Sequence, residues 1–280
     1  MPPILNDVSK EVKITLIISC GTVCYMHHSL ERALEGIARA GFEYVELLSI
    51  PKWIAAEHIK PEMNETDLRK IEKVMNKYGL SAMSLSGHID FLVKTPHDTR
   101  IAIEALERRI ELAHRMGCKY VNTGAWTTEK QSFYDTVDEL VDQCKRYGVV
   151  LGLEVGEPGL TATGKQLMGL FKHVKSENIG INYDTGNIRW LVGIEPEKDL
   201  PSTLERLVHM HVKDQVGGKG KEDFPALGDG EVNFTKVFDI LHNSTFKGPF
   251  TVEIENPREN PVQRDDEAKR SHDFIRKYVQ

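Results

Sequence analysis

The feature that most constrains the fold of this chain is an eightfold alternation between short apolar or β-branched runs and longer amphipathic runs. The short runs are typical of buried parallel strands, and the long runs are typical of helices that cover one face of a sheet. The predicted strands are Val12–Cys20, Tyr44–Ser49, Leu80–Ser86, Tyr120–Gly124, Val149–Val155, Ile179–Asp184, Leu207–Lys213 and Phe250–Glu255. The predicted helices are Leu30–Ala40, Glu65–Tyr78, His97–Met116, Ser132–Tyr147, Gly164–Ser176, a short one near Asp199–Arg206, Phe234–Asn243 and Val262–Tyr278.

Turn signals at the ends of four predicted helices support this alternation. Each of these helices is followed by a glycine in the position where helices commonly stop, namely Gly41, Gly79, Gly117 and Gly148. Eight βα units in 280 residues fit one α/β domain, a (β/α)₈ TIM barrel over residues 1–280. An open, doubly wound sheet has the same local alternation, so periodicity alone does not separate the two architectures.

Composition excludes some classes of partner. The net charge is −6, from 36 basic and 42 acidic residues, and the basic residues are scattered, which argues against a nucleic-acid partner. No run is long and apolar enough to cross a membrane, and the N-terminal apolar run is too short for a signal peptide. The four cysteines form no CxxC pair, so we expect reduced thiols and a cytoplasmic protein.

Charged residues stand near the ends of the last four predicted strands, where barrel enzymes place their chemistry. They are Glu154 in LGLEVGE, Asp184 in GINYDTGN, His211 in VHMHVKD and Glu253 in FTVEIEN. Three carboxylates and an imidazole so close together on one rim cannot all be ionised without a cation, because the like charges repel one another strongly. The sequence therefore predicts one divalent metal ion. An oxygen-rich set favours Mn²⁺, Mg²⁺ or Co²⁺, with Zn²⁺ as an alternative.

Each of these residues has a competing interpretation. A single acid at a strand end is more often structural, and only the joint occurrence of three favours a metal site. His209 and Glu255 lie two residues from His211 and Glu253, on the same faces of their strands. We expect His211 to be the ligand and His209 to be a supporting or core imidazole.

The sequence resembles the sugar phosphate isomerase/epimerase-like family of the xylose isomerase-like TIM barrel superfamily, whose members include tagatose and psicose epimerases and inosose dehydratases. The resemblance spans nearly the whole chain and is strongest in LEVGEPGLTATGKQL, DTGN, HMHVKD, LGDGEVNF and GPFTVEIE. By this resemblance Glu154, Asp184, His211 and Glu253 are the metal ligands, with Mn²⁺ as the first choice of metal. It also implies a homodimer or homotetramer.

The resemblance implies an isomerase or epimerase acting on a ketose, keto-sugar or keto-cyclitol. In such enzymes Glu154 and Glu253 would move a proton at the carbon next to the carbonyl, through a metal-stabilised enediolate. The alternative is a lyase on the same scaffold, such as an inosose or dehydroshikimate dehydratase or an enzyme that eliminates a group from a 3-keto-sugar. Both reactions begin with the same proton, so the sequence does not separate them.

The chain departs from the epimerase pattern at two substrate-contacting positions, where Asn187 replaces a histidine and Gly217 replaces an arginine. Asn187 can still bind a hydroxyl group, and Lys213 or Lys219 can supply positive charge, although a solvated loop lysine is the common alternative for either. Further candidates for substrate contact are His88, Trp126 and Glu157.

The sequence gives less support to other classes of protein. An abasic-site endonuclease needs additional histidines and a basic groove, which this chain does not show, and a purely structural barrel has little use for an open metal site. The LGDG segment (227–230) is not expected to hold a phosphate, because no strand immediately precedes it and Asp229 would repel an anion.

Overall fold

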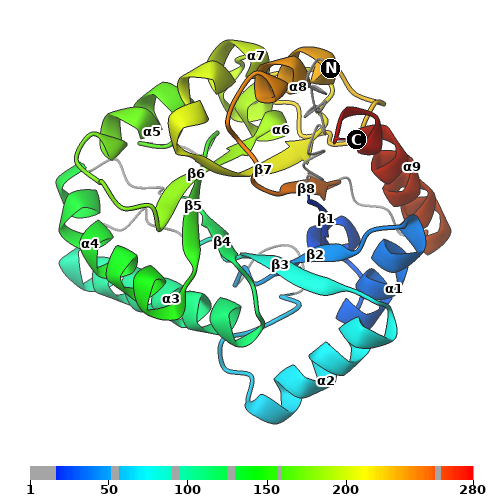
Figure 1. Ribbon diagram of the computed structural model, residues 1–280, viewed down its shortest axis with the longest axis horizontal. Helices are drawn as coiled ribbons and strands as arrows, with labels where there is room; N and C mark the ends of the chain where they lie inside the picture. Colours follow the sequence, from blue (N-terminus) through cyan, green and yellow to red (C-terminus); the bar gives the residue numbers. More distant parts are fainter. Residues whose placement is uncertain are drawn as a thin grey trace, which may run out of the picture.

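The computed structural model describes residues 17–51, 57–89, 95–124, 130–156, 159–255 and 260–279. Its eight strands run parallel and form a closed barrel in sequence order, in which β8 pairs back onto β1 (Figure 1). The strands are β1 (Ile18–Gly21), β2 (Tyr44–Leu48), β3 (Ser81–Ser86), β4 (Tyr120–Thr123), β5 (Val150–Glu154), β6 (Ile179–Asp184), β7 (Leu207–Lys213) and β8 (Phe250–Glu253). The predicted TIM barrel is confirmed, and the doubly wound alternative is wrong.

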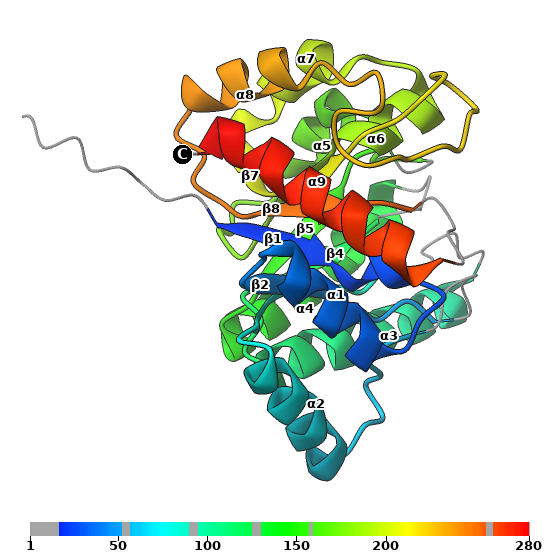
Figure 2. The same cartoon turned by 90° about the vertical axis from the view of Figure 1, so that its right-hand side faces the viewer.

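Helices surround the barrel, as Figures 1 and 2 show. They are α1 (Leu30–Ala40), α2 (Glu65–Lys77), α3 (Pro96–Arg115), α4 (Lys130–Tyr147), α5 (Gly164–Phe171), α6 (Thr185–Asn187), α7 (Pro196–Asp199), α8 (Phe234–His242) and α9 (Pro261–Val279). All four glycines that were expected to end helices have positive φ angles, between 66° and 100°. Among the described residues, no helix combines the length and apolarity needed to span a membrane.

The predicted helix bounds differ from the structure mainly in two places, and part of the first predicted strand is not tested. The helix near Asp199–Arg206 is instead α7 followed by two short 3₁₀ turns, because Pro201 has no amide hydrogen with which to continue a helix. Helix α5 ends at Phe171 rather than Ser176, and the chain leaves it through tighter bonds such as His173 N to Leu170 O. The first five residues expected in strand one, 12–16, lie outside the described residues.

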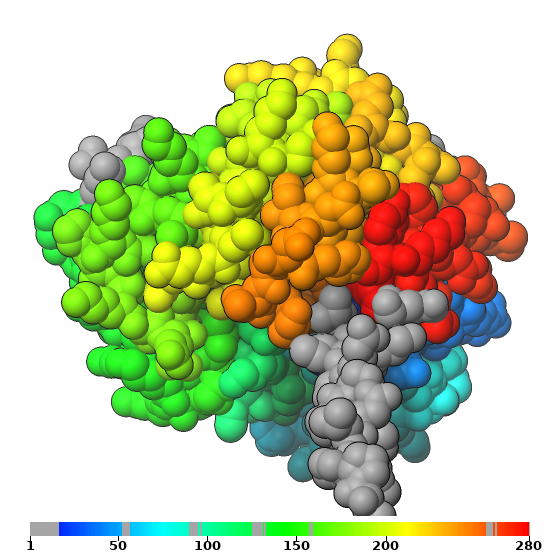
Figure 3. All heavy atoms as spheres, turned by 45° about the horizontal axis from the view of Figure 1, so that its top comes forward, coloured from blue at the N-terminus to red at the C-terminus, as the bar shows by residue number. Residues whose placement is uncertain are grey.

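The apolar core lies between the outer face of the barrel and the helices. Outward strand residues such as Val45 and Leu47 are fully buried, as are Leu34 and Ile37 of α1. Burying a side chain of this size contributes about 1.5–3 kcal/mol. On the surface, α8 and α9 lie beside each other (Figure 3). Between these two helices, the buried ring of Phe238 stacks on the ring of Tyr278 with centroids 4.8 Å apart. On the other side of α9, α1 runs alongside it (Figure 2).

The barrel interior is polar where other barrels of this class hold layers of aliphatic residues. Two register shifts accompany this polar layer, one between Val45 and Glu46 in the β2–β3 pairing and one between Ile181 and Asn182 in the β6–β7 pairing. Such irregularities re-aim side chains, and both lie beside buried polar residues. The buried polar residues of the interior include Ser19, Glu46, Ser84, Asn122, Asn182, His209 and Thr251.

Candidate metal and substrate site

The four residues predicted as metal ligands lie together at the carboxyl ends of β5 to β8. The Nδ1 atom of His211 is 2.8 Å from Oε2 of Glu154, 3.5 Å from Oε2 of Glu253 and 3.8 Å from Oδ2 of Asp184. All four side chains are buried. Three carboxylate oxygens from β5, β6 and β8 therefore lie within 3.8 Å of Nδ1 of His211 on β7, and ligand atoms of Glu154, Asp184 and His211 lie within 4.8 Å of one another.

The chemistry of this donor set fits a divalent cation. Oxygen-rich sets with one imidazole suit Mn²⁺, Mg²⁺ and similar ions. Burial also disfavours the charged form of these carboxylates: it raises the pKa of Glu253 to about 7 in spite of the neighbouring His211 and Lys213. Burial and the Glu154 carboxylate likewise raise the pKa of Asp184, against the pull of Lys213. A bound cation would relieve both groups.

The side chain of Lys213 occupies the space between the carboxylates and is fully buried. Its Nζ atom is 2.9 Å from Oδ2 of Asp184, 2.8 Å from Oε2 of Glu253 and 2.9 Å from Oε1 of Glu255. Burial opposes the charge, but these three carboxylates raise the pKa of Lys213 well above its usual value. The alternative of a solvated loop lysine is therefore wrong. Glu255 lies further out, at the rim side of Lys213.

Asn187 and His88, two of the predicted substrate contacts, both touch Glu154. Nδ2 of Asn187 donates to Oε1 of Glu154 at 2.8 Å, and Nε2 of His88 lies 3.3 Å from Oε2. Asp184 holds Asn187 in place, because its Oδ1 accepts the Asn187 backbone amide at 2.7 Å and begins a helical turn there. Trp126 and Glu157, the other two candidates, lie outside the described residues.

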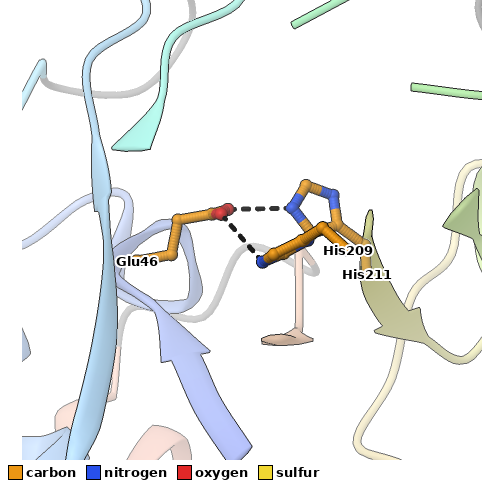
Figure 4. A group of neighbouring side chains, drawn as sticks. All are labelled: Glu46, His209 and His211. Carbon is orange, nitrogen blue, oxygen red and sulfur yellow. Dashed lines mark hydrogen bonds and ion pairs between the residues drawn. The ribbon is translucent and has the colours of Figure 1, made fainter. Parts of the chain in front are cut away.

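Beneath this cluster lies a second layer of hydrogen-bonded side chains. Nδ2 of Asn182 donates to Oε2 of Glu154 at 2.7 Å, and its Oδ1 lies 2.8 Å from Nδ1 of His209. Nδ2 of Asn122 donates to Oε2 of Glu46 at 2.6 Å, and Oε1 of Glu46 lies 2.9 Å from Nε2 of His211 (Figure 4). Burial lowers the pKa of His209 to about 3, so this imidazole is neutral. His209 therefore supports the site from below, as expected.

Sequence reasoning missed Glu46, Asn122 and Asn182. Glu46 interrupts the apolar strand YVELL, and the two asparagines alternate with apolar residues in YVNT and GINYD. A polar side chain in the middle of a strand that is otherwise fully buried was the available signal.

The long connection after β7 is built around Asp214, which follows Lys213. Its two carboxylate oxygens accept four backbone amides at 2.9–3.1 Å. The donors are Gln215, Gly228, Gly230 and Val232. Two amides of the LGDG segment, those of Gly228 and Gly230, therefore already bind a carboxylate of the chain itself. The same connection places the ring of Phe224 5.2 Å from Nζ of Lys213.

The comparisons with known proteins agree with this architecture. The family model described as "Xylose isomerase-like TIM barrel" matches residues 34–278. L-ribulose-5-phosphate 3-epimerase UlaE of Salmonella typhi is 23% identical over 263 residues, which cover 85% of this chain and 90% of that protein.

Among solved structures, the IolI protein with a bound zinc atom superposes with a TM-score of 0.78 at 20% identity, covering 94% of this chain and 99% of that one. D-allulose 3-epimerase from Methylomonas sp., in complex with D-allulose, superposes with a TM-score of 0.73 at 20% identity, covering 94% and 97%. At these identities the superpositions establish the fold alone.

Proposed function

Because this chain belongs to the xylose isomerase-like TIM barrel family, we propose that it is a divalent-metal-dependent isomerase or epimerase of a ketose, keto-sugar or keto-cyclitol. That the chain is an enzyme agrees with its curated relatives, which are named epimerases. The observation that carries the proposal is the gathering of the Glu154, Asp184 and Glu253 carboxylates around Nδ1 of His211. These four residues would hold the metal, for which Mn²⁺ is our first choice.

In the proposed reaction, Glu154 and Glu253 are the catalytic carboxylates. One takes a proton from the carbon next to the substrate carbonyl, and the other returns a proton to the opposite face. The metal, when bound, supplies a fixed positive charge beside the substrate oxygens. Asn187 and Asn182 hold Glu154 by one oxygen each, at 2.8 and 2.7 Å, so the carboxylate has one defined orientation. Such orientation makes proton transfer at a single carbon efficient.

The proposed substrate contacts are His88, Asn187 and Lys213, together with Trp126 and Glu157. Asn187 and Lys213 lie beside each other, with Oδ1 of Asn187 3.4 Å from Nζ of Lys213. A substrate hydroxyl could replace that weak contact, because an amide and an ammonium both bind hydroxyl oxygens. We also propose a cytoplasmic homo-oligomer. All four cysteines are free thiols, in keeping with a reducing compartment.

The test combines metal content with isotope exchange. The wild type and a Glu154→Gln, Glu253→Gln double variant are dialysed against Mn²⁺ and analysed by metal mass spectrometry. Each is then incubated in D₂O with candidate keto-sugars and followed by NMR. A matched control is Glu205→Gln, because Glu205 is exposed and precedes β7 at the far end of the barrel.

We expect about one metal per wild-type chain, together with deuterium at the carbon next to the carbonyl. The control should behave like the wild type, and the double variant should not exchange. An exchanged substrate that keeps its atoms indicates an isomerase, whereas a dehydrated product indicates the lyase. Wild-type protein without metal, or equal exchange in the double variant, would overturn the proposal.

A further inference from the structure

Glu46 is a buried carboxylate that the proposed reaction does not use. It lies in the middle of β2, and its side chain crosses the barrel interior to His211 on β7 (Figure 4). Strands β1 and β8 separate β2 from β7 in the closed sheet, so the contact is made through the interior and not between neighbouring strands. Oε1 of Glu46 is 2.9 Å from Nε2 of His211, and Oε2 accepts the 2.6 Å bond from Asn122.

We propose that Glu46 is a positioning residue that keeps a proton on Nε2 of His211, so that Nδ1 is the nitrogen presented to the metal. The inference rests on the proposed function, since it takes His211 as a ligand. An ionised carboxylate accepts hydrogen bonds and donates none, so the atom facing it, Nε2, is the donor. On the other side of the ring, Nδ1 faces the carboxylates of Glu154, Glu253 and Asp184 at 2.8, 3.5 and 3.8 Å, so a metal bound there would replace the proton on Nδ1 while the proton on Nε2 stays with Glu46.

Asn182 orients Glu154 on the Nδ1 side of the ring. Its Oδ1 lies 2.8 Å from Nδ1 of His209, so its amide group turns toward His211 and donates to Oε2 of Glu154 at 2.7 Å. Nδ2 of Asn182 lies 3.2 Å from Nδ1 and 3.4 Å from Nε2 of His211, so the assignment of the two ring nitrogens rests on the contact with Glu46.

A competing reading makes Glu46, His209 and His211 a second metal site, because their ligand atoms lie within 4.8 Å of one another. The contacts of His209 argue against it. Its Nδ1 lies 2.8 Å from Oδ1 of Asn182, its Nε2 lies 3.0 Å from Oγ1 of Thr251, and Nε2 is 3.7 Å from Glu46. Both ring nitrogens are already engaged in hydrogen bonds, so the group is built to orient side chains.

The variant Glu46→Gln tests this inference sharply. Asn122 still donates at its end of the side chain, so the glutamine oxygen turns toward Asn122 and the amide NH₂ faces Nε2 of His211. Two donors then oppose each other, and Nε2 loses its proton. Adding Asn122→Asp to this variant reverses the arrangement, because the new carboxylate attracts the NH₂ group and returns the glutamine oxygen to His211.

Two readouts follow the change. The ¹⁵N NMR spectrum of the imidazole reports whether Nε2 carries a proton, in metal-free and in Zn²⁺-loaded protein, and a titration measures the Mn²⁺ dissociation constant. We expect protonated Nε2 in the wild type, and loss of that proton with a 10–100-fold weaker dissociation constant in Glu46→Gln. Both should be restored in the double variant, and Glu205→Gln should match the wild type.

Other outcomes overturn the inference without touching the proposed function. These are an unprotonated Nε2 in the wild type, unchanged metal affinity and ring protonation in Glu46→Gln, or two metals per wild-type chain of which this variant loses one. Wild-type protein that binds no metal refutes the proposed function. In that case, and also if Glu46→Gln does not fold, the ¹⁵N spectrum of the metal-free wild type still tests the role of Glu46, because it reports whether Nε2 of His211 carries a proton.

Discussion

Replacing Asp214 with asparagine tests how the connection between β7 and α8 is held over the site. Each oxygen of this carboxylate accepts two backbone amides, Oδ1 those of Gln215 and Val232 and Oδ2 those of Gly228 and Gly230. Asparagine keeps one oxygen and places an NH₂ group against the other pair of donors. Two hydrogen bonds to a charged acceptor are lost, at about 1.5–3 kcal/mol each.

The expected destabilisation of Asp214→Asn is therefore about 3–6 kcal/mol if the connection and the barrel unfold together. With about 2 °C of Tm per kcal/mol for a chain of this size, Tm falls by roughly 6–12 °C. If the connection opens by itself, the global loss is smaller, and the amides of Gly228, Gly230 and Val232 exchange with solvent faster instead.

Thermal unfolding and amide hydrogen exchange measure the two effects separately. The matched control is Asp229→Asn in the same segment, because Asp229 is half-exposed and pairs only at the surface with Arg270 at 2.7 Å. Such surface pairs contribute about 0.2–1 kcal/mol. If Asp214→Asn changes Tm and exchange no more than this control, the carboxylate does not organise the connection and the reasoning is refuted.

Three further predictions follow from other contacts. In Gly152→Ala the new Cβ would lie 2.5 Å from Oδ1 of Asn122 and 3.1 Å from Cβ of Asn182, so the variant should lose about 1–3 kcal/mol in denaturant unfolding and bind Mn²⁺ more weakly; unchanged stability would contradict the tight packing of this layer. Lys213→Met leaves buried carboxylates without their cation and should destabilise the metal-free protein by about 3–5 kcal/mol. Because a metal supplies the missing charge, saturating Mn²⁺ should raise its Tm more than that of the wild type, and an equal rise would argue against this account. Burial lowers the pKa of His58 below its ordinary 6.5, so the unfolded chain takes up a proton that the folded chain does not. The free energy of unfolding should then fall as the pH drops below about 6.5, less steeply in His58→Gln, and parallel curves for the two proteins would count against it.

Periodicity predicted the eight strands and most of the helices that cover them, but it left the closure of the sheet open, because a doubly wound sheet has the same local alternation. It failed at Asp199–Arg206, where Pro201 interrupts the helix, and at Thr185–Asn187, where the Asp184 side chain caps a turn that has no apolar period. Both features depend on single residues and not on a repeating pattern.

The four converging residues could be named from the sequence because parallel strands bring their carboxyl ends to one rim. The layer of hydrogen-bonded residues beneath them could not be predicted in this way. The contact between Glu46 and His211 crosses the barrel, and the register shift beside Glu46 is set by the β2–β3 pairing, to which no local pattern points. Lys213 was equally ambiguous, since nothing in HVKD says whether the ammonium faces solvent or three carboxylates.

The pairing of β1 with β8 closes the barrel, and these two strands are synthesised at different times because they lie near opposite ends of the sequence. Oγ of Ser19 meets Oγ1 of Thr251 at 2.6 Å across this seam, and the two residues are separated by 232 positions. Because synthesis proceeds at about 5–20 residues per second, β8 is made roughly 10–50 s after β1. During that interval the nascent chain exposes an unpaired strand edge, which is a template for aggregation. The yield of folded protein in a cell should therefore depend on how fast translation proceeds and on whether chaperones cover this edge before β8 is made.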